Sequence, residues 1–190
     1  MSSLTTLNED ITTTTAAPST TKIKDSLLQL NDDCLELICK RLNTVEQFIM
    51  WKLHLRLELI IEHLWSTGSL LHTVQVEDQQ VAHLSDKEFM EFMHIISEHT
   101  VNLSLHYLRK SRFEQLITLC FPKVTILKCI DPFEQHRNQS ERYGHEALQV
   151  LQNCFPNIQE LELKGYHVRY CRDIFAIGGG NLKRLELKIL

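Results

Sequence analysis

The sequence lacks the features that mark several large classes of protein. It has no run of about 18 apolar residues, so no segment is predicted to cross a membrane. Lysine and arginine occur singly or in pairs in a chain of net charge -4, so the basic patch that phosphate binding requires is missing. We therefore expect no membrane partner and no nucleic-acid partner.

Metal-binding and catalytic motifs are missing as well. None of the 6 cysteines forms a CxxC pair, and no histidine pair has zinc-type spacing. His145-Glu146 lacks the second histidine of a zinc-protease helix, and no GxSxG, P-loop or paired-carboxylate motif occurs. We expect no metal, no cofactor and no catalytic residue, and we interpret the cysteines as reduced, buried apolar side chains.

Residues 1–24 form a tail of low complexity. Eleven of the residues from Ser2 to Thr21 are serine or threonine, and such a tract buries too little apolar surface to offset the entropy of ordering. The tail has no basic start and no apolar core of a signal peptide. Glu9 and Asp10 without any arginine argue against a mitochondrial transit peptide. We expect a disordered tail and a cytoplasmic or nuclear protein.

Residues 25–66 carry more apolar surface than a short helical unit can bury within itself. Asn31 suits an N-cap ahead of a helix over residues 32–42, and Thr44 with Gln47 predicts a capping box for a second helix. In the first and third helices apolar residues fall both on and off the main stripe. Those off it include Cys34, Leu37, Leu55, Leu59 and Ile61. This surplus of apolar surface predicts that another protein or another part of the chain covers it.

Residues 67–190 have a different periodicity. Five apolar-x-apolar segments begin at Val74, Leu103, Leu127, Leu161 and Leu185, in steps of 29, 24, 34 and 24 residues. Four helical patterns lie between them: one opened by a Ser85–Glu88 capping box, then residues 111–119, a helix after Ser140, and residues 170–177. This alternation predicts an α/β fold, a parallel sheet with helices on its outer face.

The first half resembles an F-box, the three-helix module through which receptor subunits bind the Skp-type adaptor of cullin-RING ubiquitin ligases. The matching residues are Leu30, Asp33, Leu35, Ile38, Leu42 and Glu46. Asn31 stands at the usual proline, Gln47 at a usual leucine, and Leu53, His54 and Leu57 at the usual valine, cysteine and tryptophan. On this resemblance we expect adaptor contacts from Leu30, Asn31, Leu35, Ile38 and Leu42, with Phe48, Leu53 and Leu57 shared between the interface and the module's core.

The second half resembles the leucine-rich repeats of F-box proteins. FPNIQELELKG from Phe155 and NLKRLELKI from Asn181 are its most specific parts. The resemblance implies a short solenoid of about five strands, with no polar capping repeat after the last one. It also implies a substrate-recognition subunit of an SCF-type ubiquitin ligase that holds a target protein for ubiquitin-dependent degradation.

Strand alternation supplies the candidate surface for the target protein. It points Gln75, Ser104, Lys128, Glu162 and Glu186 to one face, flanked by His106, Lys164, Arg184 and Lys188. These positions equally suit the solvated face of an ordinary sheet. A second interpretation of the whole chain is a repeat scaffold, or a shortened F-box protein, that binds partners without recruiting a ligase.

Overall fold

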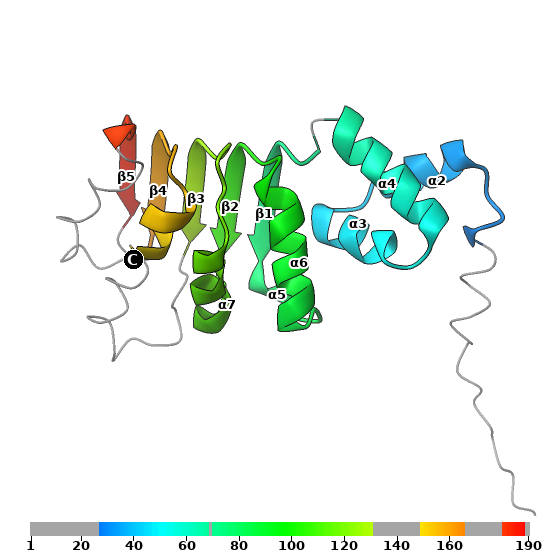
Figure 1. Ribbon diagram of the computed structural model, residues 1–190, viewed down its shortest axis with the longest axis horizontal. Helices are drawn as coiled ribbons and strands as arrows, with labels where there is room; N and C mark the ends of the chain where they lie inside the picture. Colours follow the sequence, from blue (N-terminus) through cyan, green and yellow to red (C-terminus); the bar gives the residue numbers. More distant parts are fainter. Residues whose placement is uncertain (1–26, 69, 131–148, 166–179, 189–190) are drawn as a thin grey trace, which may run out of the picture.

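The computed structural model describes residues 27–68, 70–130, 149–165 and 180–188 (Figure 1). Three helices come first, α2 (Asp32–Cys39), α3 (Thr44–Trp51) and α4 (Leu55–Thr67). Five parallel strands then follow in sequence order: β1 (Thr73–Glu77), β2 (Asn102–His106), β3 (Ile126–Ile130), β4 (Glu160–Lys164) and β5 (Arg184–Lys188). The predicted α/β class and parallel sheet are confirmed.

Between the strands lie α5 (Asp78–Val81), α6 (Asp86–Ser97), α7 (Lys110–Gln115) and the 3-10 helix η1 (Leu116–Thr118), and residues 149–154 are also helical. The predicted Ser85–Glu88 capping box is confirmed at the start of α6. The helix predicted for residues 170–177 and the disordered tail of residues 1–24 lie outside the described residues. Within the part described, no helix is long and apolar enough to span a bilayer.

The helix caps of the N-terminal module differ in part from prediction. Asn31 caps α2 as expected, because its Oδ1 accepts the N–H of Cys34 at 2.9 Å. The capping box of α3 is formed by Asn43 and Glu46, one residue earlier than the predicted Thr44 and Gln47. Asn43 Oδ1 accepts the Glu46 N–H at 3.0 Å, and Glu46 Oε2 accepts the Asn43 N–H at 2.8 Å.

Gln47 is therefore free for a different task, linking the three helices from inside. It is buried, and its Nε2 donates to the carbonyl oxygens of Cys39 at 3.0 Å and Leu42 at 3.2 Å. Its Oε1 accepts the indole N–H of Trp65 at 2.8 Å. The side chain thus pairs two carbonyl groups at and beyond the end of α2 and the polar atom of a buried tryptophan, groups that would be costly to leave unpaired.

The helical module packs directly on the sheet half through α6. The ring of Phe48 lies 5.4 Å from that of Phe92, and both side chains are fully buried. Above this contact Lys52 Nζ lies 3.0 Å from Glu88 and 3.2 Å from Glu91. The Ser85 backbone N–H, with Lys52 and the Ser85 hydroxyl, lowers the pKa of Glu88 to about 2. One hydrophobic core consequently runs from α2 to β4.

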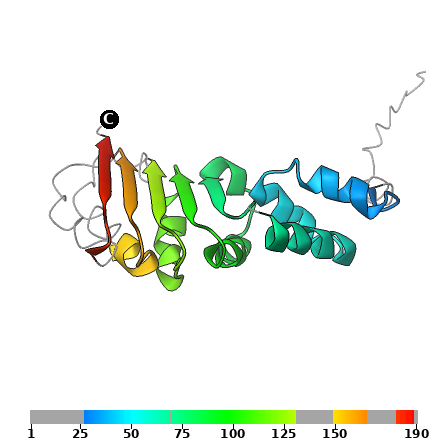
Figure 2. The same ribbon diagram turned by 90° about the horizontal axis from the view of Figure 1, so that it is seen from above.

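The sheet has one buried face and one polar face. The predicted apolar residues are in register, Val74 with Leu103, Leu127, Leu161 and Leu185, and two residues on Val76 with Leu105, Cys129, Leu163 and Leu187. Helices α6 and α7 lie on the same face of the sheet (Figure 2). The apolar residues of both rows are buried in β1 to β4 and partly buried in β5.

Burial of the cysteines is only partly as predicted. Cys39, Cys129 and Cys154 are buried free thiols, and burial raises the pKa of Cys154 to about 12. Cys34 and Cys120 are exposed instead. Cys34 lies about a quarter of a turn from the buried Leu35 on α2. The core therefore covers a narrower face of this helix than the one that its apolar residues occupy.

The hydrogen bonds of Gln47 predict that replacing it with an apolar residue of similar shape lowers the stability of the fold. Gln47→Leu puts an apolar side chain of similar size in the core. It leaves the Leu42 carbonyl and the Trp65 N–H without their side-chain partner, and it leaves the Cys39 carbonyl with the Leu42 N–H alone. We expect the free energy of unfolding to fall by about 1–3 kcal/mol, measured by urea denaturation. The control is Gln79→Leu, since Gln79 is exposed on α5; equal stability of the two variants would contradict the assignment.

Candidate functional site

The N-terminal helices expose an unusual share of the molecule's apolar side chains. Of the large hydrophobic residues that are exposed in the described part of the chain, all but Tyr107 and Ile117 belong to this module. The six are Leu30, Leu37, Ile38, Leu53, Leu55 and Leu59. We call these six residues the apolar surface of the helical module. Their number on one module makes this surface a candidate site for contact with another protein.

The predicted adaptor residues divide into two groups. Leu30, Ile38 and Leu53 are exposed and Leu42 is half-buried, while Asn31 is exposed with its side chain engaged as the cap of α2. The remaining three residues are buried: Leu35, Phe48 and Leu57. Helices α2 and α4 pack together, and Leu35 is fully buried, so its side chain is not on the surface where a partner was predicted to contact it.

Three residues of the apolar surface were not predicted as contacts. Leu37, Leu55 and Leu59 are exposed by 64%, 67% and 60%. Leu55 and Leu59 are one turn apart on α4, on the side opposite the buried Leu57 and Ile61. The signal was present in the sequence as apolar residues off the main stripe, but periodicity alone does not tell which of two apolar faces a core will cover.

The polar face of the sheet brings the predicted target-binding residues together. Pairing between the strands aligns Gln75, Ser104, Lys128, Glu162 and Glu186 in one row across all five strands. A row two residues further along contains His106, Lys164 and Lys188, and Arg184 lies in the row two residues before. The predicted ladder is thus a largely polar surface, interrupted by Ile126 and Ile130 of β3, and we call it the ladder face.

Glu162 is the centre of the charge network on this face. Its carboxylate accepts from Lys188 Nζ at 2.6 Å and lies 3.4 Å from Lys128 Nζ on the other neighbouring strand. The hydrogen bond from Lys188 is the largest cause that lowers the pKa of Glu162, and Lys128 adds to it. With only 17% of its side chain exposed, Glu162 is the least accessible charge in this network and holds three strands together electrostatically.

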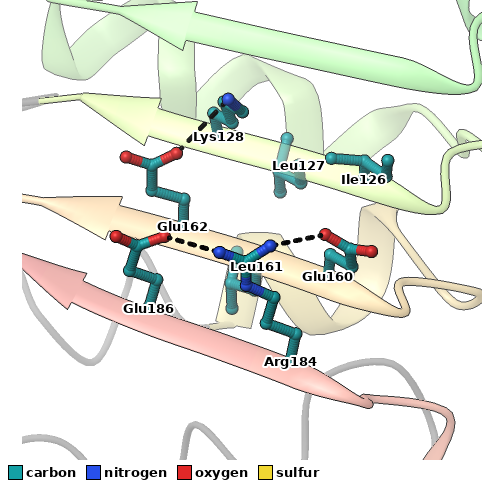
Figure 3. A pocket seen from close by; sticks show the side chains of 8 residues that line it. All are labelled: Ile126, Leu127, Lys128, Glu160, Leu161, Glu162, Arg184 and Glu186. Atoms are coloured by element: carbon teal, nitrogen blue, oxygen red, sulfur yellow. Dashed lines mark hydrogen bonds and ion pairs between the residues drawn. The ribbon is translucent and has the colours of Figure 1, made fainter.

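A shallow pocket of about 90 Å³ lies beside Glu162 between β3, β4 and β5. Arg184 reaches across it, with its guanidinium 3.7 Å from Glu160 and 3.5 Å from Glu186 (Figure 3). Ile126 and the backbone of Leu161 contribute to the lining. Because Arg184 is 66% exposed and its ion pairs are long, water and other polar groups compete for it, and it remains available to a partner.

The first two strands end in a separate group of side chains. His106 Nδ1 lies 3.4 Å from Gln75 Nε2 and 3.6 Å from the carboxylate of Glu77. The next residue, Tyr107, is exposed and has φ 54°, a backbone conformation that is uncommon for a tyrosine. Its ring meets His106 edge-on at 6.3 Å. No pattern in the sequence marks Tyr107, since its backbone conformation depends on the turn that ends β2.

Within the described ranges no three histidine, cysteine, aspartate or glutamate side chains are grouped so that they could hold a metal ion. The candidate sites that the described residues offer are the apolar surface of the helical module and the ladder face. No family model matches this chain, and comparisons with curated proteins and with solved structures likewise return no significant match.

The network around Glu162 predicts which neighbour sets its titration. Lys188→Ala should raise the pKa of Glu162 towards its ordinary value, and Lys128→Ala should raise it less, because the Lys188 hydrogen bond is the larger cause. Arg184→Ala is the control and should change it little. The measurement is a carbon-detected NMR titration of the carboxyl group.

The sign for stability follows from the direction of the shift. The folded-state pKa lies below the ordinary value, so the pairing stabilises the fold above the pKa of an unfolded glutamate, about 4.3, and this contribution is lost as the pH falls through the folded-state pKa. A larger effect of Lys128→Ala than of Lys188→Ala would contradict the order of the causes.

Proposed function

We propose that this chain is a substrate-recognition subunit of an SCF-type ubiquitin ligase, an F-box protein with a short leucine-rich-repeat half. The three N-terminal helices would bind the Skp-type adaptor, and the ladder face would hold a target protein for ubiquitin-dependent degradation. The chain would perform no chemistry itself. It would hold the target protein near the ubiquitin-carrying enzyme and so raise the effective concentration of the target at that enzyme.

The apolar surface of the helical module is the observation that carries this proposal. A module that hides Leu35, Phe48 and Leu57 yet leaves six large apolar side chains in water is built to be covered by another protein. The residues Leu30, Ile38 and Leu53, which the F-box resemblance assigns to the adaptor, belong to this surface. They are 37%, 37% and 42% exposed, so covering each would contribute only part of the roughly 1.5–3 kcal/mol of a fully exposed side chain, and several such contacts together are needed to offset the cost of association.

The sheet half supports the second part of the proposal. The five strands are parallel and follow sequence order, and α6 and α7 lie on the same face of the sheet, as the repeat resemblance implies. The opposite face is a ladder of polar and charged side chains rather than a second layer of helices. A sheet with a free polar face can bind a target through its side chains without unfolding.

The alternative function is a scaffold that binds partners through the ladder face and recruits no ligase. The burial of Leu35 favours it, since this residue was expected to face the adaptor and is not on the surface. Adaptor binding separates the two functions, because only the ligase subunit requires it.

The test is co-purification of the full chain with the Skp-type adaptor. We expect a stoichiometric complex for the unchanged chain and at least about a tenfold loss of affinity for Ile38→Glu and for Leu53→Glu, because each places a charge in an apolar interface. Ile117→Glu is the matched control, an equally exposed apolar residue on η1. Failure of the unchanged chain to bind the adaptor would leave the scaffold function in its place.

A further inference from the structure

One arginine ties the start of the helical module to α4. Arg56 lies in the first turn of α4 and donates three hydrogen bonds of 2.7 Å, from Nη1 to the carbonyl of Leu28, from Nη2 to the carbonyl of Leu30 and from Nε to the carboxylate of Asp32. The three acceptors belong to residues close together in sequence. The rigid fork of a guanidinium is suited to such a set of separate acceptors.

The turn over residues 27–31 has few other attachments. Among the described residues its further hydrogen bonds stay within the turn or run into α2: Leu30 N–H donates to Leu27 at 3.1 Å, and Asn31 caps α2. Leu27 and Leu28 are only partly buried, and neither belongs to the hydrophobic core. The turn is continuous with α2, and the Arg56 side chain supplies the hydrogen bonds that join it directly to α4.

The side chain that this turn presents is Leu30. It is 37% exposed and belongs to the apolar surface of the helical module. A contact residue on a loosely held turn must be ordered when a partner binds, and that ordering subtracts from affinity. Arg56 fixes the carbonyl of Leu30 itself, so it orders this residue before binding.

We propose that Arg56 is a positioning residue for partner binding, which holds Leu30 in the place where the partner contacts it. This role rests on the proposed binding of the Skp-type adaptor to the apolar surface. Arg56 is 34% exposed at the outer end of α4, away from the buried Leu57 and Ile61, so its loss should loosen the turn without unfolding the module.

The experiment is a double-mutant cycle in the full chain, with affinity for the purified adaptor measured by calorimetry. Arg56→Ala should weaken binding about tenfold in the unchanged background and less than about twofold in the Leu30→Ala background. Arg56→Lys should not restore binding, because a single ammonium cannot replace three donors fixed in a plane. Melting temperatures serve to show that the variants are folded.

The matched control is Arg109→Ala. Arg109 also donates its Nε to an aspartate, Asp78, at 3.0 Å, but on the sheet half. Its removal should leave adaptor affinity unchanged. An undiminished effect of Arg56→Ala in the Leu30→Ala background, no effect in the unchanged background, or full rescue by lysine would each overturn the proposal.

Hydrogen exchange keeps this test separate from that of the proposed function. The Leu30 amide, which donates to Leu27, should exchange faster in Arg56→Ala than in Arg109→Ala, whether or not the adaptor binds. Equal exchange would overturn the anchoring role even if the adaptor does bind. Absence of adaptor binding by the unchanged chain would overturn the proposed function and with it the role of Arg56 in adaptor binding, while faster exchange would still support the anchor.

Discussion

The burial of Phe48 is the contact on which the arrangement of this protein depends. Helices of 8, 8 and 13 residues cannot bury all their apolar side chains among themselves. Phe48 resolves part of the surplus by packing on Phe92 of α6, and Lys52 adds two ion pairs beside it. This contact joins the helical module to the sheet half in one core, so it also fixes where the uncovered apolar surface lies relative to the ladder face.

A parallel sheet with one face uncovered by helices needs side chains on that face that are stable in water. Parallel strands are usually covered on both faces, but here the open face carries polar and charged side chains in register. Glu162 lies between lysines on both neighbouring strands, and Arg184 lies between two carboxylates. Most of these charges are paired across strands. The paired charges are well solvated, so this face of the sheet can stay in contact with water and needs no covering layer of helices.

The sequence predicted the regular parts of this fold and missed what depends on neighbours. Alternating apolar residues determine both a strand and its register, so all five strands and the row through Glu162 were predicted. The caps show the limit, because Asn43 and Thr44 are both good N-cap residues and only the packing of Gln47 against Trp65 decides between them. The site shows it again, since Leu35 and Ile38 lie on the same predicted stripe of α2, yet Leu35 is buried and Ile38 is exposed.

The two surfaces differ in what binding would cost, and this difference predicts their roles. An exposed leucine such as Leu55 loses only its contact with water when a partner covers it, so the apolar surface favours stable attachment. A partner on the ladder face must replace ion pairs such as those of Glu162, so binding there gains little unless the new charges match the old ones closely. Stable attachment through the helices and selective recognition through the sheet are the two properties that the proposed receptor subunit would require.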